Sequence, residues 1–376
     1  MKNTNQLKAQ ATETGGTKPR SVALAFSING KNIQQAGESG AKRVDDFIID
    51  LPANHKLRKR IETPEVRKIL GSIAEHSPYL WQLSQKDPDR LERLLSKPAN
   101  GSLSSCLRLF EKSIIKTSEQ TDVMRQLRVF KQELHLLIAL ADLSGVWSVD
   151  QVVAAITSMA DCAVSAALSF LLREAASEGN IELVNVNKPG EQSGLFILAL
   201  GKHGARELNY SSDVDLIVFF DPEKNAIPDS KDAAAIFVRI TRSLIKLLQE
   251  ATEDGYALRV DLRLRPDPGS TAVAISLNAA YSYYESVGQN WERAAYIKAR
   301  PVAGDIQLGQ KFLDNLKPFI WRKYFDYAAI ADIHAMKRQI HAVRGHGEIA
   351  TAGHDIKLGR GGIREVEFFV QTQQLI

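Results

Sequence analysis

The spacing of apolar residues changes character along this chain. Residues 1–45 are polar apart from a brief apolar patch at 22–26, and we expect them to form a disordered or loosely docked tail. Beyond this tail, apolar residues recur at the intervals typical of amphipathic helices. The predicted helices cover residues 55–76, 91–95, 106–115, 121–142 and 149–176. Residues 46–190 are therefore expected to form a helical domain whose helices pack their apolar faces together.

The second half of the chain mixes strand and helix patterns. Two continuous apolar runs, at 195–200 and 214–220, predict buried strands. Residues 229–250 have the spacing of a helix, and Gly255 is expected to end it. Apolar and charged residues alternate over 256–264, which predicts a strand with one apolar and one charged face. Strand, strand, helix and strand together predict an α+β domain around one sheet, over residues 191–305.

Helical spacing dominates again toward the end of the chain. It predicts helices over residues 278–287, 291–299, 306–324 and 330–343, and a further one that begins at Ile363. We assign residues 306–376 to a second helical region. The charged residues Glu292, Arg293, Lys298 and Arg300 could line the wall of a site, but isolated charges on helices are more often solvated, so we expect them on a solvated helix face. His135, which stands among leucines, is expected to be a core or boundary histidine rather than a ligand.

Composition narrows the class of protein. The length of 376 residues suggests two or three units, and 44% hydrophobic and 24% charged residues are ordinary for a globular protein. A net charge of +4 and a pI near 8.8 do not indicate nucleic-acid binding. Cys106 and Cys162 lie in no disulfide or metal-binding pattern, which favours a reducing cytosol. No apolar run was found to reach the ~18 residues of a membrane span, so we expect a cytoplasmic protein.

Candidate chemistry gathers at the second and third predicted strands. Asp213 and Asp215 are two residues apart, so on a strand both side chains point to the same face. Adjacent carboxylates repel unless a cation lies between them, and hard oxygen ligands suit Mg²⁺. Asp261 on the third strand adds a carboxylate, and three carboxylates can hold two Mg²⁺ ions for nucleotidyl transfer. A bare Asp-x-Asp pair alone would more often be a solvated strand end.

Basic residues near these carboxylates suit a phosphate-bearing substrate. Gly201 begins a turn whose backbone N–H groups are expected to bind phosphate, with Lys202 beside it as a point charge. Arg263 and Arg265 follow the third carboxylate and can bind phosphate oxygens bidentately. Ser212 is a further candidate, although a serine that hydrogen-bonds its own turn is at least as common.

A glycine-rich segment near the end of the chain adds two possible site residues. It reads Lys357-Leu-Gly-Arg-Gly-Gly-Ile-Arg-Glu-Val-Glu367 and could form a phosphate-binding loop followed by carboxylates that reach the metals. Glu365 and Glu367 share a face only on a strand. On a helix they diverge, so at most one is expected at the site. The alternative is an ordinary helix start with acids favoured by its dipole.

Four segments together resemble a known family. They are residues 200–216, 260–266, 283–300 and 356–368. In them the chain resembles the glutamine synthetase adenylyltransferase/adenylyl-removing enzymes, members of the polymerase-β-like nucleotidyltransferase superfamily, over about residues 123–376. The resemblance implies a polymerase-β-like nucleotidyltransferase sheet domain flanked by N-terminal and C-terminal helical regions. Lys202 departs from the superfamily pattern in a way typical of this family, and His203 stands where an apolar residue is expected.

The resemblance also implies a reaction. Family members have two nucleotidyltransferase halves, of which the first removes AMP from a tyrosine of glutamine synthetase and the second adds it. The segments at 283–300 and 356–368 resemble the first half, which implies phosphorolysis of the AMP-tyrosine bond to give ADP. The family further implies ATP/ADP and phosphate as ligands and a PII-type signalling protein as regulator. Because the chain ends within an amphipathic segment, we interpret it as a fragment that lacks the second half.

Two alternatives stay open on sequence grounds. The same site could act in the opposite direction, as an ATP-dependent adenylyltransferase of glutamine synthetase. The chain could also be a non-catalytic docking or regulatory module. A nucleic-acid polymerase is disfavoured, because the net charge is small and no surface of basic and aromatic residues is evident.

Overall fold

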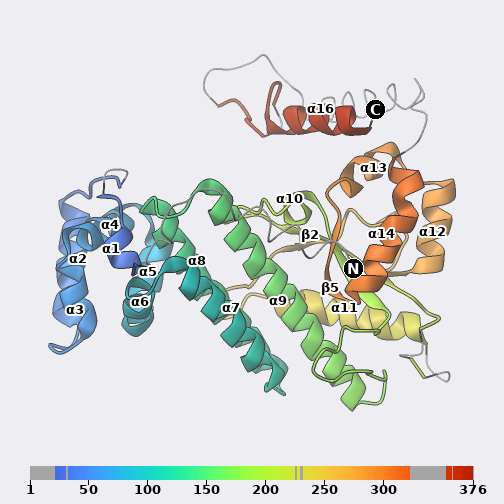
Figure 1. The fold of residues 1–376 in the computed structure, drawn as a ribbon, viewed down its shortest axis with the longest axis horizontal. Coiled ribbons are helices and arrows are strands. Elements are labelled where there is room, and N and C mark those ends of the chain that lie inside the picture. Colours follow the sequence, from blue (N-terminus) through green and yellow to red (C-terminus); the bar gives the residue numbers. More distant parts are fainter. Residues whose placement is uncertain are drawn as a thin grey trace, which may run out of the picture. The chain divides into compact units, whose positions relative to one another are not determined.

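The computed structural model describes residues 22–30, 33–224, 227–228, 232–321, 353–357 and 359–375. The chain divides into two compact units (Figure 1). Unit 1 comprises residues 1–105 and 136–148, and unit 2 comprises residues 106–135 and 149–376. These divisions differ from the expected boundaries at 45, 190 and 305, because helices α7 (Ala99–Ile115) and α8 (Gln120–Leu143) contribute residues to both units. The helix expected at 330–343 lies outside the described residues.

Unit 1 begins with short helices whose starts are set by local chemistry. They are α1 (Leu24–Ser27), α2 (Glu38–Asp50), α3 (Lys56–Ile61), α4 (Pro64–His76), α5 (Pro78–Lys86) and α6 (Pro88–Leu95). Proline occupies the first position of α4, α5 and α6, where a backbone N–H would have no helical partner. The side chains of Ser77 and Asp87 accept hydrogen bonds from backbone N–H groups of α5 and α6 and so cap them.

Part of the expected tail is ordered in this unit. Residues 22–45 contain α1 and the first half of α2. Leu24 of α1 and both Val44 and Phe47 of α2 are buried, and the Phe47 ring meets the Trp81 ring edge-on with centroids 5.6 Å apart. A few apolar residues at helical spacing are enough to hold this segment, which the polar composition of residues 1–45 concealed. Residues 1–21 lie outside the described part.

Unit 2 contains the long apolar helix α9 (Val149–Ser177). By length and composition α9 could cross a membrane, contrary to the expectation that no apolar run reaches that length, but 78% of its most apolar stretch is buried inside the structure. That burial is typical of the core helix of a folded domain. In the same unit the rings of Phe110 and Phe130 stack with centroids 3.9 Å apart, joining α7 to α8.

A mixed five-stranded sheet forms the centre of unit 2. Its strands are β1 (Leu195–Ala199), β2 (Val214–Phe220), β3 (Val260–Asp261), β4 (Ala274–Ser276) and β5 (Arg300–Gly304). The order is β3-β2-β1-β5, and β4 also pairs with β2. β1 is antiparallel to β2 and β5, whereas β2 is parallel to β3 at its start and to β4 at its end. The predicted α+β fold class is confirmed.

Helices cover both faces of this sheet. On one face Phe196 and Phe219 pack against Phe312 of α14 (Ile306–Ile320), with ring centroids 5.7 and 4.7 Å away, and α12 (Leu277–Ser286) joins the same core. On the other face Phe220 meets Phe237 of α11 (Ala233–Gln249) at 5.2 Å. Strands buried on both faces have continuous apolar runs, which is why β1 and β2 were predictable.

Three predicted features of unit 2 differ from the structure. The strand expected over 256–264 is only the two residues of β3, because Ala257 and Leu258 are both buried and a turn follows Asp261. Helix α11 ends at Gln249, and Gly255 (φ +83°) lies instead in a tight turn with Thr252. Strands β4 and β5 were not predicted, since β4 has only three residues and β5 has no continuous apolar run.

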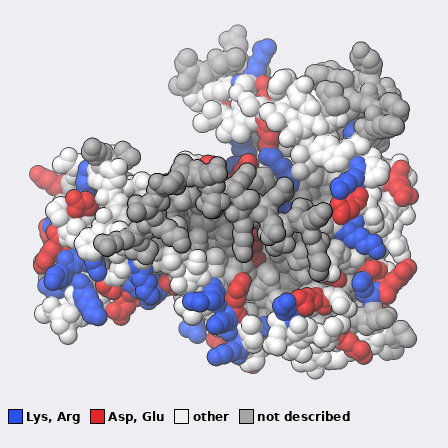
Figure 2. Space-filling view, viewed as in Figure 1, with Lys and Arg blue, Asp and Glu red and all other residues white. Residues whose placement is uncertain are grey.

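Two charged side chains expected on a solvated surface are buried. Glu292 and Arg293 lie in α13 (Asn290–Tyr296) and are 1% and 0% exposed. Arg293 donates hydrogen bonds to the carbonyl oxygens of Phe319 and Ile320, which end α14. The Glu292 carboxylate accepts from the Tyr283 hydroxyl and the Gln289 backbone. His135 is buried, as expected. On the face in Figure 2, acidic and basic side chains are interspersed.

Candidate active site

Asp215 and Asp261 stand side by side at the edge of the sheet. They are register partners where β2 and β3 run parallel, so their carboxylates belong to neighbouring strands at the same level. Burial, then the charges of Asp261 and Asp213, raises the pKa of Asp215 to about 6. The structure thus brings the three predicted carboxylates into one electrostatic neighbourhood.

Gly201 lies directly against this pair. It begins the short helical turn α10 (Gly201–Gly204) that follows β1, and it has φ +54°. A Cβ atom at Gly201 would lie 2.5 Å from Oδ2 of Asp215. The Leu200 N–H also donates to the backbone oxygen of Asp215, at 2.9 Å. Glycine is required here both by the backbone conformation and by the room that the Asp215 carboxylate occupies.

Two arginines neutralise the other carboxylates. Arg259 donates to the Asp213 carboxylate and to the backbone oxygen of Ser211. Arg263 binds Asp261 through both its side chain and its backbone N–H, and these hydrogen bonds hold the pKa of Asp261 below its usual value. The Arg263 side chain is 83% exposed, whereas that of Asp261 is 14% exposed. Arg263 therefore reaches inward from solvent to a half-buried acid.

The donor chemistry of this site fits a hard divalent cation. Three carboxylates share one neighbourhood, and burial followed by the charges of Asp261 and Asp213 raises the pKa of Asp215, an effect that a bound cation would oppose. In the described part of the chain no three acidic, histidine or cysteine side chains are close enough to enclose an ion as they stand. To bind the cation, Asp213 would have to release Arg259, and Asp261 would have to release Arg263. Both arginine side chains are exposed, so they can move away into solvent.

Several predicted site residues have other roles in the structure. Arg265 donates to the backbone oxygens of residues 262, 268 and 271 and so organises the loop after β3. The Ser212 hydroxyl accepts from the Asn209 N–H, the turn-stabilising role that was the alternative for it. Lys202 is exposed at α10. These residues are near the carboxylates in sequence, but Arg265 and Ser212 contact backbone atoms of their own loops rather than the carboxylates.

The glycine-rich segment opens a helix rather than a strand. Helix α16 covers Ile363–Leu375, so Glu365 and Glu367 diverge, as expected for a helix. Glu365 accepts a hydrogen bond from the Gly361 N–H just ahead of α16. Glu367 pairs with Lys298 at 2.5 Å, and Lys298 also lies 3.7 Å from Glu207. Neither glutamate contacts the three aspartates directly.

Sequence reasoning preferred a solvated face for Lys298 and underused Lys357. A pocket of about 440 Å³ lies between α10 and α16, and both Lys202 and Lys298 line it. The Lys357 ammonium acts on Asp215 and opposes the rise in its pKa. The signal for Lys357 was present, since it begins the glycine-rich segment. The sequence also offers Lys298 as part of the site wall, but an isolated lysine on a helix end is usually solvated.

Comparisons with known proteins show one family over most of the chain and a second family model over its last residues. A family model described as glutamate-ammonia ligase adenylyltransferase matches residues 67–315, and one described as GlnD PII-uridylyltransferase matches residues 334–376. The chain is 55% identical over 313 residues to a bifunctional glutamine synthetase adenylyltransferase/adenylyl-removing enzyme of Xanthobacter autotrophicus, covering 83% of this chain and 32% of that protein. It is 48% identical over 351 residues to the enzyme of that name from Bradyrhizobium sp. strain BTAi1, covering 93% and 36%. It is 50% identical over 342 residues to the one from Brucella suis, covering 89% and 35%. The chain thus spans about a third of the length of these relatives.

Proposed function

We propose, because this chain belongs to the glutamate-ammonia ligase adenylyltransferase family, that it removes AMP from a tyrosine of adenylylated glutamine synthetase by phosphorolysis. The observation that carries the proposal is the pairing of Asp215 with Asp261 across parallel strands, with Asp213 close enough to raise the pKa of Asp215. Such a cluster beside a glycine turn suits the transfer of a nucleotidyl group, whose transition state carries spread negative charge.

The proposed reaction exchanges one bond to phosphorus for another. An oxygen of inorganic phosphate forms a bond to the AMP phosphorus, and the bond from that phosphorus to the tyrosine oxygen breaks. The products are ADP and the unmodified tyrosine, whose oxygen gains the proton that phosphate gives up. No oxidant or further reactant is needed. Binding and orientation are the main tasks left to the protein.

We assign roles in this exchange to the residues of the candidate site. Asp213, Asp215 and Asp261 would hold Mg²⁺, which when bound supplies countercharge for the phosphate oxygens. Arg259 and Arg263, released from their acids, would then be free to bind phosphate groups bidentately. Lys202 would add a point charge from α10, and Gly201 leaves room for the Asp215 carboxylate. Arg265 acts on the loop that carries Arg263 rather than on the substrate.

One assay tests the proposal with a matched control. The chain is incubated with adenylylated glutamine synthetase, Mg²⁺ and phosphate, and ADP is measured. We expect Asp213→Asn to lower ADP formation by at least about 100-fold, since one oxygen ligand loses its charge. Asp314→Asn, which removes an exposed acid paired with Lys317 on α14, should keep full activity. Full activity in Asp213→Asn would overturn the proposal.

The same preparation separates the alternatives. Transfer of label from ATP to unmodified glutamine synthetase would favour adenylylation by this site. No ADP and no label, with synthetase still bound, would favour a docking module. The match of residues 334–376 to a PII-uridylyltransferase family supports a link to PII-type signalling, and we propose such a protein as regulator. We further propose that the reaction takes place in the cytoplasm.

A further inference from the structure

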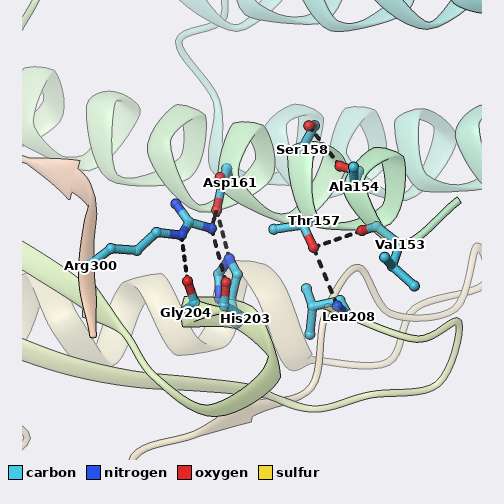
Figure 3. A network of polar contacts seen from close by, with 9 residues as sticks. All are labelled: Val153, Ala154, Thr157, Ser158, Asp161, His203, Gly204, Leu208 and Arg300. Carbon is cyan, nitrogen blue, oxygen red and sulfur yellow. Dashed lines mark hydrogen bonds and ion pairs between the residues drawn. The ribbon is translucent and has the colours of Figure 1, made fainter. Parts of the chain in front are cut away.

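A polar network joins three distant segments of unit 2 at the turn that carries Gly201 (Figure 3). Asp161 projects from α9, Arg300 from the start of β5, and His203 from α10. One oxygen of Asp161 accepts from Nε2 of His203 at 2.7 Å and from Nη2 of Arg300 at 2.8 Å. The hydrogen bonds and ion pairs of Asp161 and His203 in this network do not involve the three aspartates of the candidate site.

Arg300 also holds the backbone of the turn. Its Nε donates to the carbonyl oxygen of Gly204 at 3.1 Å, and its Nη2 donates to that of His203 at 3.0 Å. The last carbonyl groups of a helix have no partner further along it, and in the four-residue α10 Arg300 supplies donors to them, although the His203 carbonyl also accepts from the Arg206 N–H at 3.2 Å. Arg300 therefore couples the end of α10 to the strand that pairs with β1.

The protonation states make this network a fixed unit. Burial outweighs the pull of the Asp161 carboxylate and lowers the pKa of His203, whose side chain is fully buried. Burial opposes ionisation of Asp161, but the hydrogen bonds from His203 and Arg300 outweigh it and lower the pKa of Asp161. A neutral imidazole thus donates from Nε2 to a carboxylate that is also paired with Arg300. Each group holds the next in one orientation.

A second contact ties the same segment to α9. The Thr157 hydroxyl accepts from the Leu208 N–H at 3.3 Å while it donates to the Val153 carbonyl at 2.8 Å (Figure 3). Thr157 and Asp161 are one turn apart on α9, so that helix holds residues 201–208 at two points. The Gly204 backbone is close-packed as well, since a Cβ there would lie 2.0 Å from the Lys298 oxygen.

We propose that Asp161, His203 and Arg300 are positioning residues that set where α10 presents Gly201 and Lys202 relative to Asp215. This positioning role rests on the proposed function, because the rate of phosphorolysis would depend on the distance between the bound phosphate and the carboxylates. Gly201 lies so close to Asp215 that a small rotation of α10 would change the carboxylate as well. A shift of about 1 Å at such a site costs about 100-fold in rate.

The test compares variants of the full chain in the phosphorolysis assay. We expect Asp161→Asn and Arg300→Lys each to lower kcat by about 10- to 100-fold, with KM for adenylylated synthetase within about twofold. The double variant should be no slower than the worse single one, because the residues act as one unit. His203→Leu should be slow, whereas His203→Gln, whose amide can donate to Asp161, should recover most of kcat. Asp314→Asn is the control for loss of one acid elsewhere in unit 2.

Two results would overturn the positioning role. One is multiplication of the single effects in the double variant, and the other is equal loss in His203→Leu and His203→Gln. If the unaltered chain releases no ADP, the proposed function fails, and hydrogen exchange then tests the network independently. The amides of Gly204 and Ala205 should exchange at least about 10-fold faster in Arg300→Lys than in the unaltered chain, with those of α14 unchanged. Unchanged exchange at α10 would overturn the network.

Discussion

At the residue scale, two separate constraints require glycine at position 201. Its φ of +54° is a conformation that side-chain-bearing residues rarely adopt, and the space where a Cβ would lie is occupied by the Asp215 carboxylate. The first constraint concerns stability, because a strained backbone raises the free energy of the folded state. The second concerns the site, because a methyl group would displace a predicted metal ligand.

Gly201→Ala and Gly255→Ala separate these two constraints. Gly255 has φ +83° but nothing within 4 Å of the added Cβ. We expect both variants to lose about 1 kcal/mol of unfolding free energy in urea titrations. Only Gly201→Ala should also lose phosphorolysis, by about 10-fold or more, since only it moves the carboxylate. Equal activity in the two variants would contradict this account of the turn.

The candidate site residues differ in how far the sequence alone could predict their roles. The proximity of Asp213 and Asp215 was predictable, because two-residue spacing beside a buried strand brings carboxylates to one face, whereas the role of these two residues and Asp261 as metal ligands stays a prediction. Arg265 was not, since only the folded loop shows that its guanidinium donates to backbone oxygens. His203 stood out as a polar residue where an apolar one was expected. Its partner Asp161, on a helix 42 residues earlier, could not be inferred from spacing.

At the scale of elements, buried arginines cap the C-terminal ends of two helices of unit 2. Arg128 of α8 is fully buried and donates to the carbonyl oxygens of Leu247 and Glu250 at the end of α11, and to that of Gly255 beyond it. Arg293 does the same for α14. These carbonyls have no helical partner, so each arginine replaces a cap and joins two helices.

Removing the Arg128 guanidinium should therefore lower the stability of unit 2. We expect Arg128→Met to lower the free energy of unfolding of unit 2 by about 2–4 kcal/mol, because several buried carbonyl groups lose their donor. Arg239→Met on α11, whose side chain is 58% exposed and lies 3.7 Å from Glu178, should change it by no more than about 0.5 kcal/mol. Denaturant titration monitored by circular dichroism measures both. A loss below about 1 kcal/mol for Arg128→Met would contradict the capping role.

The elements themselves were predictable to different degrees. Helices α8, α9 and α14 and strands β1 and β2 were found because their apolar pattern is sustained over many residues. β3 was overestimated, since Arg259 and Arg263 alternate with apolar residues yet serve to bind Asp213 and Asp261. β4 has only three residues, β5 has no continuous apolar run, and they depend on pairing with β2 and β1. Tertiary pairing of this kind leaves little trace in local sequence.

At the scale of the whole molecule, buried titratable groups link the stability of unit 2 to pH. Burial, followed by the charge of Lys131, lowers the pKa of His135 from 6.5 to about 3. Its ring lies 6.2 Å from the Tyr210 ring, with Lys131 one turn away on α8. The unfolded chain binds a proton at this position below pH 6.5 and the folded chain does not, so the free energy of unfolding falls as the pH falls through this window.

His135→Phe tests this linkage, because it keeps a ring beside Tyr210 and removes the titrating group. At pH 7.5 the variant is expected to be less stable, since the substitution disturbs the packing around the buried His135. Between pH 6.5 and pH 5 the unaltered chain should lose about 2 kcal/mol more unfolding free energy than the variant, at roughly 1.4 kcal/mol per pH unit. The two curves of unfolding free energy against pH, measured by urea titration, should therefore converge on acidification. Parallel curves across this window would show that His135 takes up a proton in the folded unit as readily as in the unfolded chain.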